Sequence, residues 1–193
     1  CDIKGRASHE IITQGVEVLR HLSHRGATGA DPKTGDGAGL LIQTPHEFFA
    51  KVFKNLPAPG GYGAGLVFLP TDKEDYKFCK DIFAEFIRKE GQLLLGWRQV
   101  PVMVREIGET ARQTQPIIEQ VFIAKAKKDK DQGKDSGLDF ERKLYIIRKQ
   151  IENKIRASKI KQKSFFYITN LSSRTFSYKG LLMPYQLESF FTD

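Results

Sequence analysis

The first residue of the chain, Cys1, carries two groups that could act together in chemistry. A cysteine at a free amino terminus offers a thiol nucleophile, and its own α-amino group is a base that can accept the thiol proton. These groups titrate near pH about 8.5 and about 8, so a pair held together would be poised close to neutral pH. The residue therefore predicts a nucleophile activated by its own amine.

The stretch from His24 to Gly39 is rich in glycine, aspartate and threonine. This composition excludes a helix or a regular strand, and indicates a shaped loop that brings backbone amides close to another group. Asp31 and Asp36 bracket its centre, and aspartates in such turns usually bond their own backbone. The acids lack EF-hand spacing, and no Gly-Lys-Ser/Thr follows the glycines. We therefore predict neither a metal site nor a phosphate site here.

Hydrophobic periodicity predicts the elements that must position these groups. Ser8 is a favourable N-cap for a helix that begins at His9 and ends near Gly26. The remaining helices are expected over residues 45–53, 72–89, 140–157 and 184–191, and strands over 37–43, 62–69, 92–100, 102–107, 120–124, 165–171 and 175–178. Residues 125–139 are polar and aperiodic, and we predict a mobile loop. The strands carry consecutive apolar residues, which is typical of an α/β (α+β) layered fold with both sheet faces covered.

Composition narrows the class of protein. A chain of 193 residues with 40% hydrophobic and 28% charged residues is expected to form a single globular domain over 1–193. No apolar run approaches the length of a membrane span, so no membrane partner is predicted. The net charge is +8, but acids are interleaved among the basic residues. This pattern favours a solvated face over nucleic-acid binding, and a basic patch that docks an acidic partner domain is an alternative comparable with nucleic acid.

The two cysteines, Cys1 and Cys79, do not form a disulfide framework or a CxxC pair. No metal, iron–sulfur cluster or other cofactor is therefore expected on this chain. Cys79 lies on the apolar stripe of a predicted helix and is expected to be a packed free thiol. This cysteine usage fits a reducing cytoplasm.

Two segments resemble a known family. Residues His24–Phe49, and more weakly Leu171–Leu182, are similar to the N-terminal glutamine amidotransferase domain of the glutamate synthase large subunit. These are class II amidotransferases of the N-terminal-nucleophile hydrolase type. The resemblance implies a four-layer αββα sandwich, of which this chain would be the N-terminal, partial portion.

The resemblance also implies a function. Cys1 would attack the side-chain amide of L-glutamine with its own amine as base, and Arg25 and Gly26 would shape the site beside it. Arg25 has a second interpretation, in which it caps helix carbonyls. Ammonia would pass to a synthase domain or subunit that acts on 2-oxoglutarate. FMN and an iron–sulfur cluster would belong to that parent enzyme, in the cytoplasm or, in a plant, a plastid.

The sequence departs from the family pattern at two places. Cys1 runs directly into Asp2, where the family has a glycine and a short apolar strand. The family's glutamine-carboxylate arginine and its oxyanion hole are expected after Asp193, so the isolated chain is expected to be inactive. Arg174 is interpreted as a strand-edge arginine. Two alternatives stay open: a non-catalytic structural or interaction domain with a degenerate amidotransferase fold, and a different N-terminal-nucleophile amidohydrolase.

Overall fold

The computed structural model describes residues 2–27, 30–126 and 138–193. The helices are α1 (His9–His21), η1 (Leu22–Arg25), α2 (His46–Val52), α3 (Lys73–Lys89), η2 (Val104–Glu106), α4 (Glu109–Gln113), α5 (Leu138–Ala157), η4 (Lys163–Phe165) and α6 (Gln186–Phe190). The strands are β1 (Ala38–Gln43), β2 (Tyr62–Leu69), β3 (Leu93–Gln99), β4 (Ile117–Ala124), β5 (Tyr167–Ile168) and β6 (Thr175–Gly180). The elements form two antiparallel sheets with helices, which confirms the predicted mixed α/β class.

The chain divides into two compact units. The unit that we call the sheet unit contains Thr44–Gln99 and Pro116–Phe176. The unit that we call the loop unit contains Cys1–Gln43, Val100–Gln115 and Ser177–Asp193. The prediction of one domain over 1–193 stays a prediction.

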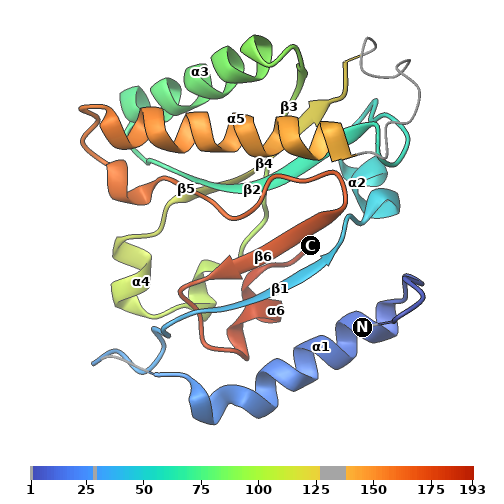
Figure 1. Ribbon diagram of the computed structural model, residues 1–193. Helices are drawn as coiled ribbons and strands as arrows, with labels where there is room; N and C mark the ends of the chain where they lie inside the picture. The colour runs from blue at the N-terminus through green and yellow to red at the C-terminus, as the bar shows by residue number, and fades with distance from the viewer. Residues whose placement is uncertain (1, 28–29, 127–137) are drawn as a thin grey trace. The chain divides into compact units, whose positions relative to one another are not determined.

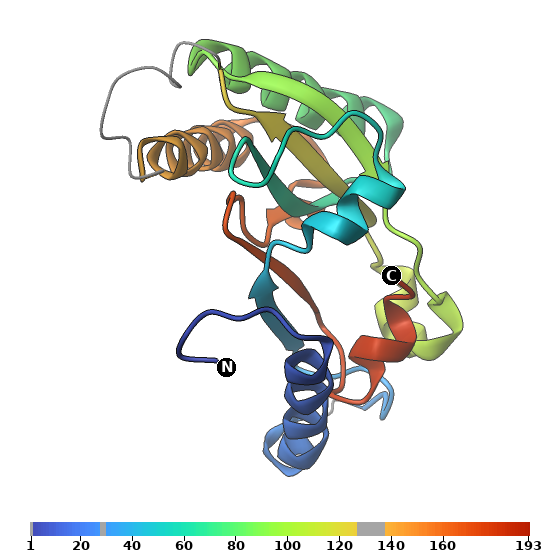
Figure 2. The same ribbon diagram turned by 90° about the vertical axis from the view of Figure 1, so that its right-hand side faces the viewer.

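A four-stranded antiparallel sheet in the order β3-β4-β2-β5 forms the centre of the sheet unit. β2 and β4 pair along their whole length, from Tyr62 opposite Ala124 to Leu69 opposite Ile117. Helices α3 and α5 lie side by side on one face of this sheet, and α2 lies on the other (Figures 1 and 2). Both central strands are therefore covered on both faces, as their continuous apolar sequences predict.

The core of the sheet unit lies between the sheet and helices α3 and α5. Side chains spaced three and four residues apart along α5 are fully buried there, as the sequence predicts (Leu144, Ile147, Ile151 and Ile155). They pack with Phe83 of α3 and Val121 of β4 in one apolar cluster. On the opposite face, Phe49 of α2 packs edge-on against Phe122. Burial of apolar surface on both faces is the main source of stability in this unit.

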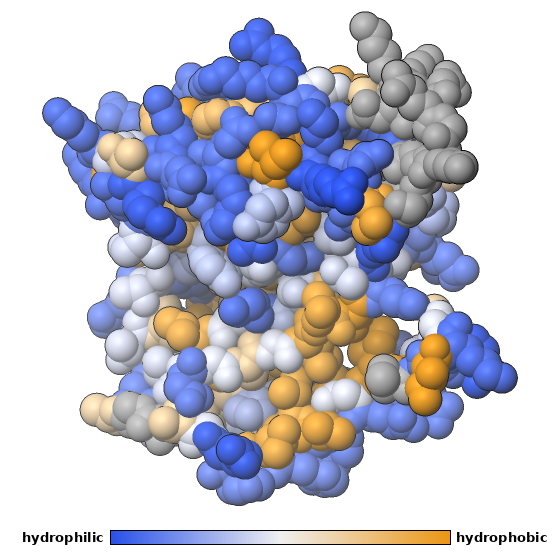
Figure 3. Space-filling view, viewed as in Figure 1, coloured by the Kyte–Doolittle hydropathy of each residue, from blue (hydrophilic) through white to orange (hydrophobic). Residues whose placement is uncertain are grey.

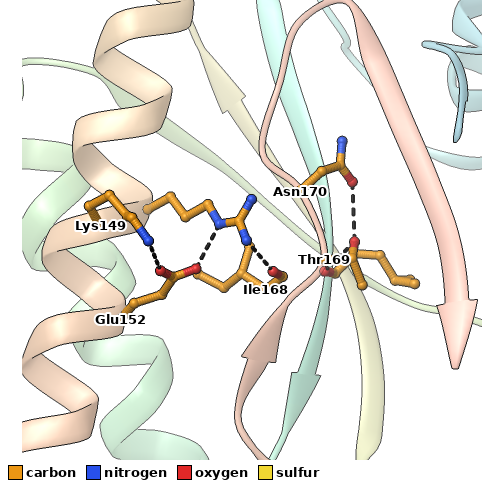
Figure 4. A network of polar contacts seen from close by, with 7 residues as sticks. Lys149, Glu152, Ile168, Thr169 and Asn170 are labelled. Atoms are coloured by element: carbon orange, nitrogen blue, oxygen red, sulfur yellow. Dashed lines mark hydrogen bonds and ion pairs between the residues drawn. The ribbon is translucent and has the colours of Figure 1, made fainter. Parts of the chain in front are cut away.

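Polar contacts tie α5 to the short strand β5 (Figure 4). Arg148 donates to the carboxylate of Glu152 at 2.7 Å and to the carbonyl oxygen of Ile168 at 2.9 Å. One residue further, the hydroxyl of Thr169 donates to the carbonyl of Leu66 at 3.1 Å. These bonds fix the edge of the sheet after β5 ends.

The loop unit is built differently. Its two-stranded sheet pairs β1 with β6, and α1 packs beside β1 without burying any residue completely. Leu41 on β1 exposes 66% of its surface and Leu181 exposes 70%. Figure 3 shows apolar side chains gathered on the face that includes β1. Leu187 and Phe190 on α6 are among the apolar side chains that are buried in this unit.

Two local predictions need correction, and one helix was missed. Val102–Ile107 is not a strand: Val102 makes a single bridge with Phe191, and η2 follows at once. The chain turns here because the amide of Glu106 donates to the carbonyl of Met103 at 3.0 Å and that of Ile107 to the carbonyl of Val104 at 3.4 Å. The strand expected over 165–171 is limited to β5, because η4 occupies its beginning. Helix α4 was not predicted.

The predicted mobile loop over 125–139 cannot be compared with the structure as a whole, because residues 127–137 lie outside the described residues. Within the described residues on either side, Lys125 and Ala126 follow β4, and Leu138 begins α5. Nowhere in the described ranges is there a helix long and apolar enough to cross a membrane.

Candidate functional site

Cys1, the predicted nucleophile, lies outside the described residues, but the segment after it is ordered by one carboxylate. Asp2 accepts hydrogen bonds from the amide of Lys4 at 2.7 Å and from Nε of Arg6 at 3.0 Å. The side-chain bond from Arg6 is the main cause that lowers the pKa of Asp2. The carbonyl of Gly5 accepts a bond from the side chain of Gln43 at 3.1 Å, which places this segment at the end of β1.

Arg25 and Gly26 lie at the other end of α1. Arg25 ends η1 with an exposed side chain, and within the described part of the chain it makes no hydrogen bond or ion pair. The capping interpretation therefore finds no support. Gly26 closes the turn by donating to the carbonyl of Ser23 at 3.1 Å. The 13 residues of α1 span about 20 Å, so the structure does not bring residues 2–6 together with Arg25.

Asp31 organises the glycine-rich loop, as the sequence predicts for an aspartate in such a turn. Its carboxylate accepts bonds from the amide of Lys33 at 3.0 Å and from the hydroxyl of Thr34 at 2.9 Å. It also accepts a bond from the amide of Thr110, in the first turn of α4, at 3.1 Å. These hydrogen bonds, with that from Lys33 the largest cause, lower the pKa of Asp31. The carboxylate is thus committed to structure.

Two glycines make close contacts at the loop. A Cβ at Gly35 would lie 2.6 Å from the backbone carbonyl of Leu182, and a Cβ at Gly108 would lie 2.1 Å from Oδ2 of the Asp31 side chain. Gly35 therefore requires glycine in this arrangement, whereas a side chain at Gly108 would displace the carboxylate of Asp31. The prediction of a shaped loop near another group is confirmed, and the nearest groups are segments of the loop unit itself.

Gln186 is the residue that the sequence analysis missed at this loop. Its side chain is 99% buried, since only 1% is exposed. Nε2 donates to the carbonyl of Lys33 at 2.9 Å and to that of Glu106 at 2.7 Å. Oε1 accepts from the amide of Met183 at 2.7 Å. The available signal in the sequence was a glutamine side chain among the apolar residues of a short predicted helix.

Arg174 lies in a tightly bonded turn of the sheet unit. The side chain is exposed, and the backbone amide donates to the hydroxyl of Ser172 at 3.0 Å. Glu141, in the first turn of α5, accepts bonds from the hydroxyl of Ser172 at 2.9 Å and from the amide of Ser173 at 2.6 Å. The prediction of a strand-edge position is consistent with its place immediately before β6.

Cys79 is a packed thiol, as predicted. It lies on the buried face of α3 with no exposed surface. Burial, together with the charge of Asp75, raises the pKa of its thiol to about 12. At neutral pH it is therefore protonated and a poor nucleophile. Across the described residues, no group of three or more His, Cys, Asp or Glu side chains could hold a metal ion.

The whole chain, residues 1–193, matches the family of class II glutamine amidotransferases. The chain belongs to this family.

Its relatives are glutamate synthases. The chain is 45% identical over 193 residues to the glutamate synthase (NADPH) large chain of Bacillus subtilis, covering 99% of this chain and 12% of that protein. It is 38% identical over 195 residues to the corresponding large chain of Azospirillum brasilense, with the same coverage. It is also 38% identical over 190 residues to ferredoxin-dependent glutamate synthase 1, chloroplastic/mitochondrial, of Arabidopsis thaliana, covering 96% and 11%. The chain thus spans about an eighth of the length of these relatives, and the resemblance to the glutamate synthase amidotransferase domain is confirmed.

Proposed function

We propose that this chain forms part of the glutaminase site of a glutamate synthase, with Cys1 as the nucleophile. The observation that carries the proposal is the similarity to glutamate synthase large chains over 99% of the chain, together with the family match over residues 1–193. The inert state of Cys79 supports it, because burial leaves that second thiol unsuited to catalysis.

The proposed reaction uses the two groups of Cys1. The sulfur adds to the side-chain carbonyl carbon of glutamine while the α-amino group takes the thiol proton. The carbon–nitrogen bond then breaks, and nitrogen leaves with that proton as ammonia, so a thioester remains. Water adds to the thioester carbon, the carbon–sulfur bond breaks and the sulfur regains a proton. Glutamine and water give glutamate and ammonia.

Arg25 and Gly26 belong to the same proposal as groups that shape the site. A guanidinium near a thiol lowers the thiol pKa and stays protonated itself. This role requires the reacting residue to reach the loop, which lies one helix length from residues 2–6. If it does, Arg25→Met will raise the thiol pKa of Cys1, measured from the pH dependence of its alkylation. An unchanged profile would exclude Arg25 from the site.

The whole enzyme is a further part of the proposal. Ammonia would pass to a synthase domain or subunit that converts 2-oxoglutarate to glutamate. FMN and an iron–sulfur cluster would lie in that part of the enzyme and not on this chain. A cytoplasmic location is proposed, or a plastid for a plant protein, and fractionation with an antibody to this chain tests it.

A diazo-ketone analogue of glutamine tests the nucleophile directly in the full-length protein. We expect one adduct on the peptide that contains Cys1, none on Cys79, and protection by glutamine. Cys1→Ser will abolish labelling, and Cys79→Ser will retain it. Amino-terminal sequencing of the same sample shows whether the mature protein begins at Cys1 with a free amine. If Cys1 were not labelled, or if its amine were blocked, the proposed mechanism would be contradicted.

A non-catalytic domain with an amidotransferase fold is the second candidate. It is favoured by one observation: residues 2–6 contact the end of β1 near Gln43, away from Arg25. On this candidate the diazo-ketone reacts with Cys1 no faster than iodoacetamide does, and glutamine gives no protection. The labelling experiment therefore separates the two functions.

A further inference from the structure

The side chain of Gln186 makes three hydrogen bonds, all of them to backbone atoms. Both protons of Nε2 are donated to carbonyl oxygens, those of Lys33 and Glu106, and Oε1 accepts the amide of Met183. The residue exposes only 1% of its surface. A buried amide is costly unless its bonds are made, and here every donor is used. Its orientation is therefore fixed from three directions.

These bonds meet at the centre of the glycine-rich loop. The carbonyl of Lys33 accepts a second bond, from the amide of Gly108 at 3.2 Å, so both of its lone pairs are occupied. Asp31, two residues earlier, caps the first turn of α4 through Thr110. Hydrogen bonds thus tie the loop at Lys33 to Gln186 and Gly108, and at Asp31 to Thr110.

An apolar residue would suffice if this position served only to pack α6. Its helical neighbours Leu187 and Phe190 are apolar and buried in the ordinary way. The amide instead fixes the position of the backbone that it contacts, because hydrogen bonds depend on distance and angle. Apolar contacts do not impose such geometry. The loop that the amide fixes carries the residues most similar to the amidotransferase family.

We infer that Gln186 is a positioning residue for the glutamine site: its amide sets the place of loop residues 31–35, which would form a wall beside the substrate. This inference rests on the proposed function, both for the identity of the substrate and for the place of the loop beside it. The hydrogen-bonded geometry of the loop does not depend on that function.

The test compares two variants of the full-length protein. Gln186→Met keeps the side-chain length and removes all three hydrogen bonds. Gln162→Met is the matched control, because the side-chain oxygen of Gln162 also accepts bonds from two backbone amides, those of Thr71 and Asp72, at 2.8 Å each. The readout is the ratio of two rates at Cys1: labelling by the diazo-ketone, which requires recognition of the glutamine skeleton, and alkylation by iodoacetamide, which does not.

We expect this ratio to fall at least about tenfold in Gln186→Met and to stay within about twofold in Gln162→Met. A purely structural role would change both rates together and leave the ratio intact, and that result would overturn the inference. Gln186→Asn provides a milder change if the first variant does not fold. This variant shortens the side chain by one methylene and keeps the amide. We expect the ratio of the two rates to fall less than in Gln186→Met.

Hydrogen exchange separates this inference from the proposed function. The amide of Gly108, which donates to Lys33, should exchange about tenfold faster in Gln186→Met than in the control. Unchanged exchange there would show that Gln186 does not hold the loop, whatever the labelling shows. If the unmodified protein is not labelled at Cys1, the proposed function fails, and the exchange rates still decide whether Gln186 positions the loop.

Discussion

The sheet unit and the loop unit are each stabilised by a different kind of interaction. In the sheet unit, α3 and α5 bury a continuous apolar cluster against β2 and β4. In the loop unit, α1 buries no residue completely, and Asp31 and Gln186 fix the loop through hydrogen bonds to backbone atoms. Apolar burial tolerates local variation, whereas a hydrogen bond is lost when its geometry changes. We therefore expect mutations in the sheet unit to change mainly the free energy of unfolding, and mutations in the loop unit to change mainly the geometry of the loop.

The largest expected effect is in the core of the sheet unit. Ile147→Ala in α5 removes a fully buried side chain and should lower the free energy of unfolding by about 3–4 kcal/mol. Ile12→Ala in α1, where the side chain is half-buried, should cost about 1 kcal/mol. Urea unfolding followed by the fluorescence of Trp97, the single tryptophan, measures the sheet unit. Equal shifts for the two variants would contradict the division between the units.

A partly buried ion pair gives the next largest effect. Lys80 Nζ lies 2.8 Å from Oε2 of Glu119, and their side chains are 24% and 10% exposed. Lys80→Met would leave the Glu119 carboxylate without its charge partner and should cost about 2–3 kcal/mol. Lys77→Met, which breaks a pair with 78% and 63% exposure, should cost at most about 0.5 kcal/mol. The same urea measurement compares the two variants. If Lys80→Met left the free energy of unfolding unchanged, this ion pair would not contribute to the stability of the sheet unit.

Tyr62→Phe should have a smaller effect, with a clear pH signature. The hydroxyl of Tyr62 lies 3.2 Å from Nδ1 of His46, and losing this bond should cost about 1 kcal/mol. Burial raises the pKa of Tyr62 to about 12. The unfolded chain releases the phenol proton near pH about 10, so stability falls as pH rises from there to the folded pKa. The variant should lose less stability over this range in melting experiments, and an identical alkaline profile would argue against a buried phenol.

Asp31→Asn is expected to give the smallest change in stability, and this change should be seen at acid pH. Hydrogen bonds lower the pKa of Asp31, so its charge stabilises the fold above the unfolded pKa of about 4 and is lost as pH falls through the folded pKa. The variant should therefore lose less stability on acidification than the parent protein. Thermal melting between pH 2 and 6 measures the difference. Asp36→Asn, an exposed acid of the same loop, is the control, and the same behaviour from both would contradict a special role for Asp31.

Much of the sheet unit could be predicted from the sequence because its elements are periodic. The stripe of Leu144, Ile147, Ile151 and Ile155 predicts the buried face of α5, and α3 begins within one residue of its predicted start at residue 72. The error at Val102–Ile107 has a physical cause, since a short apolar run next to charged residues fits a strand or an irregular segment equally well. The bonds that close η2, from Glu106 to Met103 and from Ile107 to Val104, select the second.

The candidate site was predictable in part. The composition of the loop indicated its shape, and the family was recognised from the same residues. Gln186 was missed because its three partners are backbone atoms at Lys33, Glu106 and Met183, and a sequence does not show which carbonyls will lie within reach. The roles of Cys1, Arg25 and Gly26 stay predictions.

Residue types and their periods alone determined the family, the mixed α/β class and the faces that helices and strands bury, because those properties depend on neighbours along the chain. Tertiary structure alone decided that Gly35 lies against the backbone of Leu182 and Gly108 against the carboxylate of Asp31, and that the amide of Gln186 holds two distant segments at Lys33 and Glu106. The physical reason is that hydrogen bonds and close backbone approaches act over a few ångströms. Which residues meet at that distance is settled only when the chain has folded.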